Sequence, residues 1–280
     1  MLALRDKLTV FHFDGTDYVD HSGACYDFMR DTVEITLDGV DDFLYVGYYK
    51  PITALYAMLP TPATAGGALT LELWNGSAWT AVTMVDDTAC FSRSGFLRWS
   101  RSDVEVGDID KTTVHNSELY WFRISASQET VATFQGLSLL FCDERDLRVD
   151  DPRVSDTDYL RTETTQINAL VSARDEIVQE LRNKGELVVD IANGLWRDLS
   201  SWDLLEVEQV RYAAVNLALS KIYMGLSDRE DDVWYVKATL RRQAYESLIK
   251  NMLIAVDNND NGVKDGSETN KVWGTAEMYR

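Results

Sequence analysis

Cysteine is scarce in this sequence. The chain of 280 residues contains three, Cys25, Cys90 and Cys142, which are widely spaced and form no C-x-x-C pair. An odd number of cysteines at such spacings argues against a disulfide scaffold and favours folding in a reducing cytosol. We therefore exclude the class of small secreted domains that are held together by disulfides.

Long hydrophobic runs are absent too. No apolar stretch approaches the roughly 18–20 residues that a helix needs to span a bilayer. The first 15 residues lack the apolar core and the small-residue cleavage site of a signal peptide. We expect a soluble protein that is made in the cytoplasm and has no membrane partner.

Positive charge is in short supply. Lys and Arg number 27 against 46 Asp and Glu, a net charge of −19, and both halves of the chain are acidic. No Lys/Arg-rich run is present, which argues against sequence-specific reading of nucleic acid. An acidic surface repels DNA and would suit a protein that DNA passes without adhering, although solubility alone explains it equally well.

Motifs of common enzyme classes are also missing. His12, His21 and His115 stand in neither an H-x-x-x-H nor an H-E-x-x-H pattern, and there is no G-x-S-x-G elbow, Walker loop or Rossmann fingerprint. Gly66-Gly67 precedes predicted strands, whereas a phosphate-binding loop would open a helix. The sequence therefore predicts that the protein is not an enzyme.

What the chain does contain changes character near residue 150. The first half alternates apolar and polar residues: Val33, Ile35 and Leu37 lie on one face of a predicted strand. In "ALTLELWNGSAWTAV" two strands flank Asn75-Gly76, the strongest short-range signal for a hairpin. Segments 118–127 and 133–143 read as further strands, so we predict an antiparallel β-sandwich or jelly-roll-like domain.

The second half has helical spacing. We predict one long helix within 158–184, a second within 201–226 and a third that follows the acidic segment 227–232 and runs to residue 256. Asp203 and Glu206 have the spacing of a capping box at the start of the second helix. Between the first two helices, "ELVVDIANGLWRDLSS" predicts a small hairpin or an irregular excursion.

These patterns together predict an α+β protein. Its parts would be a β-sandwich domain over 1–145, a bundle of long α-helices over 146–256, and an acidic loop with a C-terminal tail over 257–280. The aromatic residues of the first half have two explanations, a sugar-stacking platform or core packing, and we favour packing. These residues are Trp74, Trp79, Trp99, Tyr120 and Trp121.

The segment "DNNDNGVKDGSE" fits the EF-hand loop pattern at every specified position. Ca²⁺ prefers six to eight oxygen ligands, which the spacing supplies, with Gly262 permitting the sharp turn. Three carboxylates among the five side-chain ligands predict modest affinity. The candidate ligands are Asp257, Asn259, Asn261, the Val263 carbonyl, Asp265 and Glu268.

The loop departs from a full EF-hand in two ways. Lys264 stands where paired loops carry an apolar residue, and "TNKVWGTAEMYR" is too short for an exit helix. There is also no second loop, which disfavours a calcium sensor. A structural cation site is the leading interpretation, and an acidic turn that binds nothing tightly is the alternative.

Two regions together resemble virion proteins of tailed bacteriophages. The run "LYVGYYKPITALY", the "LELWNGSAW" hairpin and the "YWFRI" strand resemble a β-domain of such proteins. The region "DPRVSDTDYLR…WDLLEVEQVRYAAVNLALSKIYMGLSDREDD", with its acidic ending, resembles their head–tail connector (adaptor) proteins. The resemblance covers most of the chain and rests on pattern, not on a catalytic signature.

The resemblance implies a structural role in the virion neck. Such adaptors form a ring, generally of twelve copies, below the portal protein, and they extend the DNA channel toward tail or neck proteins. The C-terminal tail would be a docking arm, and the candidate anchors for partner binding are Trp273, Met278 and Tyr279. A frayed terminus is the simpler explanation of the same residues.

Two other classes of function stay open. The β-sandwich could belong to a tail or baseplate module that recognises host-surface carbohydrate, and aromatic residues lining one exposed face would favour that hypothesis. A polysaccharide hydrolase would instead need two carboxylates roughly 5–10 Å apart across a cleft.

Overall fold

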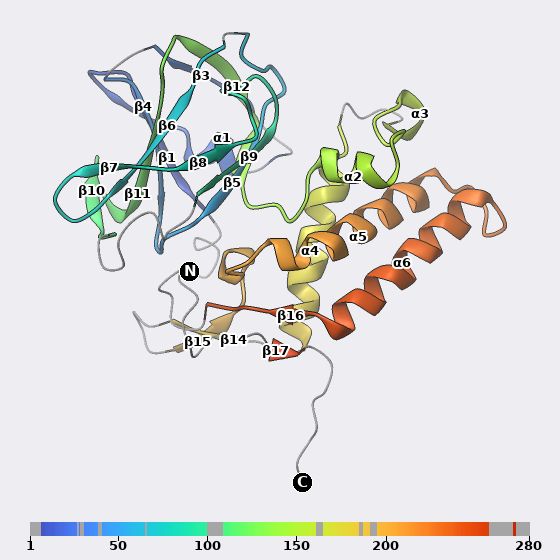
Figure 1. The fold of residues 1–280 in the computed structure, drawn as a ribbon. Helices are drawn as coiled ribbons and strands as arrows, with labels where there is room; N and C mark the ends of the chain where they lie inside the picture. The colour runs from blue at the N-terminus through green and yellow to red at the C-terminus, as the bar shows by residue number, and fades with distance from the viewer. Residues whose placement is uncertain are drawn as a thin grey trace. The chain divides into compact units, whose positions relative to one another are not determined.

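The chain forms two compact units, Met1–Leu139 and Leu140–Arg280. The structure, a computed structural model, describes residues 7–26, 28, 31–38, 41–64, 66–99, 109–160, 165–184, 187–190, 195–257 and 271–272. Figure 1 shows strands in blue to green in the first unit and the long helices in yellow to red in the second.

The first unit is rich in β-structure. Its elements in chain order are β1 (Thr9–Phe13), β2 (Tyr18–Asp20), α1 (Ser22–Tyr26), β3 (Val33–Leu37), β4 (Phe43–Tyr48), β5 (Ala54–Met58), β6 (Leu69–Trp74), β7 (Trp79–Val82), β8 (Met84–Asp86), β9 (Gly95–Trp99), β10 (Thr112–Val114), β11 (Ser117–Ala126), β12 (Thr130–Phe134) and β13 (Gly136–Ser138).

These strands form three antiparallel sheets. The largest has seven strands in the order β2-β1-β4-β11-β6-β7, with β10 pairing β11. A second sheet has the order β13-β5-β9-β8, and β12 pairs with β3. The Trp99 ring of β9 packs on the Phe122 ring of β11 at 5.1 Å between centroids, so side chains of the two larger sheets share a core.

Alternation correctly predicted the buried faces of several strands. Ile35 and Leu37 of β3 are buried, and so are Leu71 and Leu73 of β6. The predicted hairpin is β6–β7, with a loop over residues 75–78.

The turn of this hairpin differs from the two-residue turn that Asn75-Gly76 suggests. Only Gly76 of the pair has positive φ, at 88°. The Asn75 side chain instead accepts hydrogen bonds from the N–H groups of Ser77 and Ala78, at 3.0 and 2.8 Å. An Asx turn therefore sets this loop.

The prediction of one strand over 133–143 was wrong. The segment divides between β12, which pairs with β3, and β13, which pairs with β5. A Cβ atom added at Gly136 would overlap the Phe28 ring. The chain changes sheets at a residue whose missing side chain makes room for that ring, which alternation alone does not reveal.

The second unit is mainly helical. Its elements are α2 (Glu144–Asp150), α3 (Thr157–Leu160), α4 (Ile167–Asn183), β14 (Leu187–Asp190), β15 (Leu195–Asp198), the 3₁₀-helix η2 (Ser201–Asp203), α5 (Glu208–Leu226), α6 (Val233–Asn251), β16 (Leu253–Ile254) and β17 (Lys271–Val272). The hairpin predicted between the first two long helices is β14–β15.

Helix α5 is the centre of this unit. It packs against both α4 and α6, and Figure 1 shows α5 and α6 running side by side. Every residue of α5 from Ala213 to Ser220 is buried, whereas Tyr212 and Met224 are exposed. Burial on all sides over these two turns places this part of the helix in the core of the unit.

The predicted start of this helix was wrong. Asp203 is not its N-cap, because α5 begins at Glu208. The Asp203 carboxylate instead accepts from the Ser200 N–H at 2.6 Å and binds both terminal nitrogens of Arg197. Asp203, which local spacing assigned to a helix cap, therefore forms a buried ion pair with Arg197 instead.

The predicted acidic start of the third helix was right. Asp232 is the N-cap of α6, and its carboxylate accepts from the Tyr235 N–H at 2.7 Å. This hydrogen bond, together with those from the N–H groups of Asp228 and Arg229 and from the Ser227 hydroxyl, lowers the pKa of Asp232 to about 2. Within the described residues no helix is long and apolar enough to cross a bilayer. The domain ranges 1–145, 146–256 and 257–280 stay predictions.

Candidate interaction surfaces

One side of the seven-stranded sheet is covered by aromatic rings. Strand alternation turns Leu44, Val46 and Phe122 toward the shared core, and the residues between them point the other way. We call the second side the aromatic face, and its residues pack together as one cluster. The aromatic face consists of Phe11, Phe13, Tyr18, Phe43, Tyr45, Trp79 and Trp121.

The rings of the aromatic face differ in exposure. Phe11, Tyr45 and Trp121 are buried, and the Phe11 and Trp121 rings stack at 5.4 Å between centroids. Phe43 and Trp79 are only partly buried. The face therefore has a packed base and several rings that solvent reaches.

Gly47 makes room for the largest of these rings. A Cβ atom at this position would lie 2.6 Å from Cζ3 of Trp121. The glycine on β4 thus allows the Trp121 ring to lie flat against the backbone of the neighbouring strand.

An ion pair lies among the rings. Arg123 Nε of β11 donates to Glu72 Oε2 of β6 at 2.6 Å, and the two side chains are 19% and 21% exposed. The guanidinium lies 4.2 Å from the Phe43 ring centroid and 4.8 Å from that of Trp79. The sheet register places this charged pair on the same side as the aromatic rings.

The sequence did not point to this pair, because its members are 51 residues apart. Of the five aromatic residues singled out from the sequence, Trp79 and Trp121 belong to the aromatic face. Trp74 contacts Trp79 at 5.6 Å between ring centroids. Trp99 is in the shared core, as packing predicts, and Lys111 lies over the Tyr120 ring.

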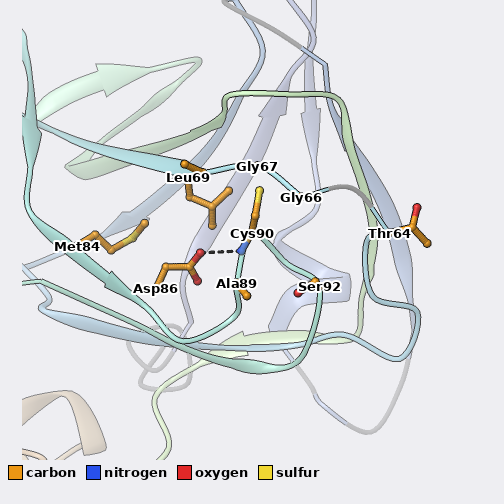
Figure 2. Close-up of a pocket in the computed structure, with 10 residues that line it drawn as sticks. Thr64, Gly66, Gly67, Leu69, Met84, Asp86, Ala89, Cys90 and Ser92 are labelled. Carbon is orange, nitrogen blue, oxygen red and sulfur yellow. Dashed lines mark hydrogen bonds between the residues drawn. The ribbon is translucent and has the colours of Figure 1, made fainter.

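A pocket of about 560 Å³ lies beside strand β8 (Figure 2). Figure 2 shows Asp86 turned toward the backbone nitrogen of Cys90, which donates to it at 2.7 Å. The Cys90 Sγ atom lies 3.6 Å from Thr130 Oγ1. Because these polar groups already contact other groups of the protein, we assign the pocket no ligand. Its lining residues are Thr64, Gly66, Gly67, Ala68, Leu69, Met84, Asp86, Ala89, Cys90 and Ser92.

Helix α6 exposes a stripe of apolar residues. Val233, Val236, Leu240 and Leu248 are 61%, 51%, 59% and 37% exposed. The first three follow i, i+3, i+7 spacing and the fourth comes two turns later, so all four lie on one side of the helix. We call this set the α6 stripe.

The other side of α6 is held by polar contacts. The guanidinium of Arg242 pairs with Glu176 of α4, and that of Arg241 pairs with Asp150 of α2. Ser220 Oγ of α5 donates to the Ala238 carbonyl at 2.9 Å. These contacts fix which side of the helix faces outward, and that side carries the stripe.

A buried carboxylate ties other parts of the helical unit together. Asp151 Oδ2 accepts from the hydroxyls of Tyr223, at 2.8 Å, and Tyr159, at 3.1 Å. Burial raises the pKa of Asp151, but these hydrogen bonds and that from the Arg153 N–H outweigh it, and the pKa lies below its usual 3.8. Burial and the nearby carboxylate raise the pKa of Tyr223. This cluster is structural, since it links α3 to α5.

The acidic loop is described only at its first position. Asp257 is fully buried, and its N–H donates to the Asp203 carbonyl at 2.8 Å. A β-bridge between Leu204 and Val256 holds the chain just before it. The other predicted calcium ligands and the predicted anchors lie outside the described residues, namely Asn259, Asn261, Val263, Asp265, Glu268, Trp273, Met278 and Tyr279.

The first loop position is therefore fixed on the segment before α5, while calcium binding stays a prediction. Across the part of the chain that the structure describes, no group of three or more His, Cys, Asp or Glu side chains is arranged to hold a metal ion.

Comparison with known proteins leaves the class undecided. No protein-family model matches the chain, and no curated protein matches it. Chitosan-binding module 1, derived from a chitosanase/glucanase of Paenibacillus sp. IK-5, is 14% identical with a TM-score of 0.27, over 47% of this chain and 92% of that chain.

A second solved structure is CpGH89 from Clostridium perfringens, in complex with its substrate GlcNAc-alpha-1,4-galactose. It is 11% identical with a TM-score of 0.28, over 63% of this chain and 20% of that chain. At TM-scores this low, neither likeness carries an argument about fold or function.

Proposed function

We propose that the protein is a structural, non-enzymatic component of a tailed-phage virion, a head–tail connector that forms a ring below the portal. In this proposal a β-sandwich domain is attached to a bundle of long helices, and the helices build the ring. DNA passes through the ring without sequence-specific binding, and tail or neck proteins bind beyond it. The α6 stripe is the observation that carries the proposal.

The stripe needs a partner, because apolar side chains aligned on one helix face gain free energy when they are covered. Burying apolar surface contributes about 25 cal/mol per Å². Single exposed apolar residues are ordinary, but four on one side of a helix are typical of an interface.

Charge favours a second copy of the chain as that partner. The turn before α6 contains Asp228, Glu230, Asp231 and Asp232, whereas the exposed Lys250 lies at the other end of the helix. Although Arg229 offsets one of these charges, the acidic end of α6 in one copy is complementary to Lys250 of the next copy. Stripe against stripe would close as a two-fold dimer, so in a ring each stripe covers a different surface of the neighbouring copy. Repetition of one head-to-tail contact closes a ring when the rotation between copies permits it.

Mass photometry of the purified protein, alone and mixed with its cognate portal, tests this proposal. We expect a complex with the mass of a ring. The mixture is measured first, because a portal can template assembly. Leu240→Glu should weaken assembly at least tenfold, since it places a charge in the apolar contact. Val85→Glu is the matched control, because Val85 is 56% exposed but lies in the β-rich unit.

The result that would contradict the connector is a chain that stays monomeric and ignores the portal. Removal of residues 269–280 tests the docking arm separately: we expect it to abolish portal binding.

The aromatic face favours a second candidate function. A tail or baseplate module that recognises host-surface carbohydrate would need aromatic rings along one accessible face. Partly exposed rings of the seven-stranded sheet meet that requirement. This candidate predicts binding by a single copy of the chain, whereas the connector acts only as a ring, and a glycan array separates the two.

A further inference from the structure

We propose that the aromatic face binds a neutral oligosaccharide, whose hydroxyl groups are bound by Arg123 and Glu72. This inference rests on the second candidate function and is independent of ring assembly. It assigns the site to a sheet face and names the polar groups that orient the ligand.

The first observation is the unused hydrogen-bonding capacity of the ion pair. Arg123 has five N–H donors, and its contact with Glu72 uses Nε. Within the described residues, the terminal nitrogens of Arg123 and the Oε1 atom of Glu72 have no hydrogen-bond partner. Both side chains remain about one-fifth exposed, so a ligand can reach them.

The second observation is the apolar surface around the pair. The guanidinium lies close to both the Phe43 ring and the Trp79 ring, and both rings are partly exposed. Phe13 and Tyr18 continue the partly exposed surface across β1 and β2, with 4.6 Å between their ring centroids. Ligand sites commonly combine an aromatic lining with a few fixed polar groups.

These features match the chemistry of a sugar. A pyranose has apolar C–H groups that pack on rings, and neighbouring hydroxyls that both donate and accept hydrogen bonds. The arginine fork supplies paired donors, and the carboxylate supplies the acceptor. A bulky protein partner would instead strip water from the ion pair, which costs free energy unless its hydrogen bonds are replaced.

Charge argues against an acidic ligand. The two charges of the pair cancel, and the chain as a whole carries −19. An acidic polysaccharide would be repelled by this field.

The packed base of the aromatic face, where the Trp121 ring lies against Gly47, holds in place the strands that carry the ion pair.

A printed array of neutral and acidic glycans tests the inference, followed by calorimetric titration of the strongest neutral binder into the full-length protein. We expect neutral glycans to be bound and acidic ones not. Trp79→Ala and Glu72→Gln should each weaken binding at least tenfold. Glu72→Gln nearly preserves side-chain shape, so it remains informative if the tryptophan variant unfolds. Val85→Ala, which alters an exposed residue outside the face, should leave affinity unchanged.

The outcomes separate the two ideas. If no neutral glycan binds the wild-type protein, both the second candidate and this inference fail. If a glycan binds equally well to wild type, Trp79→Ala and Glu72→Gln, the carbohydrate function stands and the site is elsewhere. If Trp79→Ala loses a tail or neck protein and no glycan binds, the face is a protein interface and the inference is overturned.

Discussion

Ala89, Cys90 and Phe91 form an unusual turn between β8 and β9. Their φ angles are 52°, 57° and 58°, in the left-handed region that residues with a Cβ rarely occupy. The Asp86 carboxylate accepts from the N–H groups of Thr88, at 2.8 Å, and Cys90, at 2.7 Å. Backbone strain of this kind persists only where neighbouring contacts hold it, and here the carboxylate supplies them.

Asp86→Ala should therefore destabilise the β-rich unit. Two N–H groups would lose a charged acceptor, and the strained turn would lose its anchor. We expect the free energy of unfolding to fall by about 2–4 kcal/mol, measured by urea unfolding with tryptophan fluorescence. Asp86→Asn keeps one acceptor oxygen and should cost less. Equal stability of Asp86→Ala and wild type would show that the loop holds its own shape.

At the scale of elements, one carboxylate joins three helices. Glu176 of α4 accepts from Lys221 Nζ of α5 at 2.5 Å and pairs with Arg242 of α6. Burial raises the pKa of Glu176, but these two cations outweigh it, and the pKa lies below its ordinary value of 4.5. A lowered carboxylate pKa stabilises the fold above the unfolded pKa, and this contribution is lost as pH falls through the folded pKa.

Glu176→Gln should reveal this contribution. We expect the helical unit to lose about 1 kcal/mol near neutral pH, because solvent screens a partly exposed pair. The difference from wild type should shrink as pH falls below about 4.5. Urea unfolding followed by far-UV circular dichroism at several pH values measures it.

Glu246→Gln is the matched control, since Glu246 pairs with Arg242 within α6 at 3.2 Å. Such an i,i+4 pair contributes about 0.2–0.5 kcal/mol. A Glu176→Gln difference that persists unchanged at low pH would contradict the assignment of the stabilisation to the ionised carboxylate.

Local features of the sequence predicted the secondary-structure elements better than they predicted the contacts between residues far apart in the chain. Alternation identified the buried faces of β3 and β6, because burial on one side of a strand repeats every second residue. It did not reveal the pairing of Arg123 with Glu72, which depends on the register of strands far apart in the chain. The start of α5 was missed for the same reason, since Arg197 binds the aspartate that local spacing assigned to a cap.

At the scale of the whole molecule, the division after Leu139 predicts independent folding. Residues 1–139 and 140–280, produced separately, should each unfold cooperatively with a midpoint close to that of the same unit in the full chain. Differential scanning calorimetry of the three proteins measures this. A fragment without a cooperative transition would show that its unit needs the rest of the chain.

The position of β11 has a consequence for synthesis. Phe122 pairs with Val46 of β4 on one side and with Leu73 of β6 on the other, so the strand that joins them is made last. During translation both earlier strands leave the ribosome with an unpaired edge, and such edges promote aggregation. The helical unit depends on contacts between neighbours such as α5 and α6, which form faster. A nascent chain that stalls before residue 117 is thus the species that most needs a chaperone.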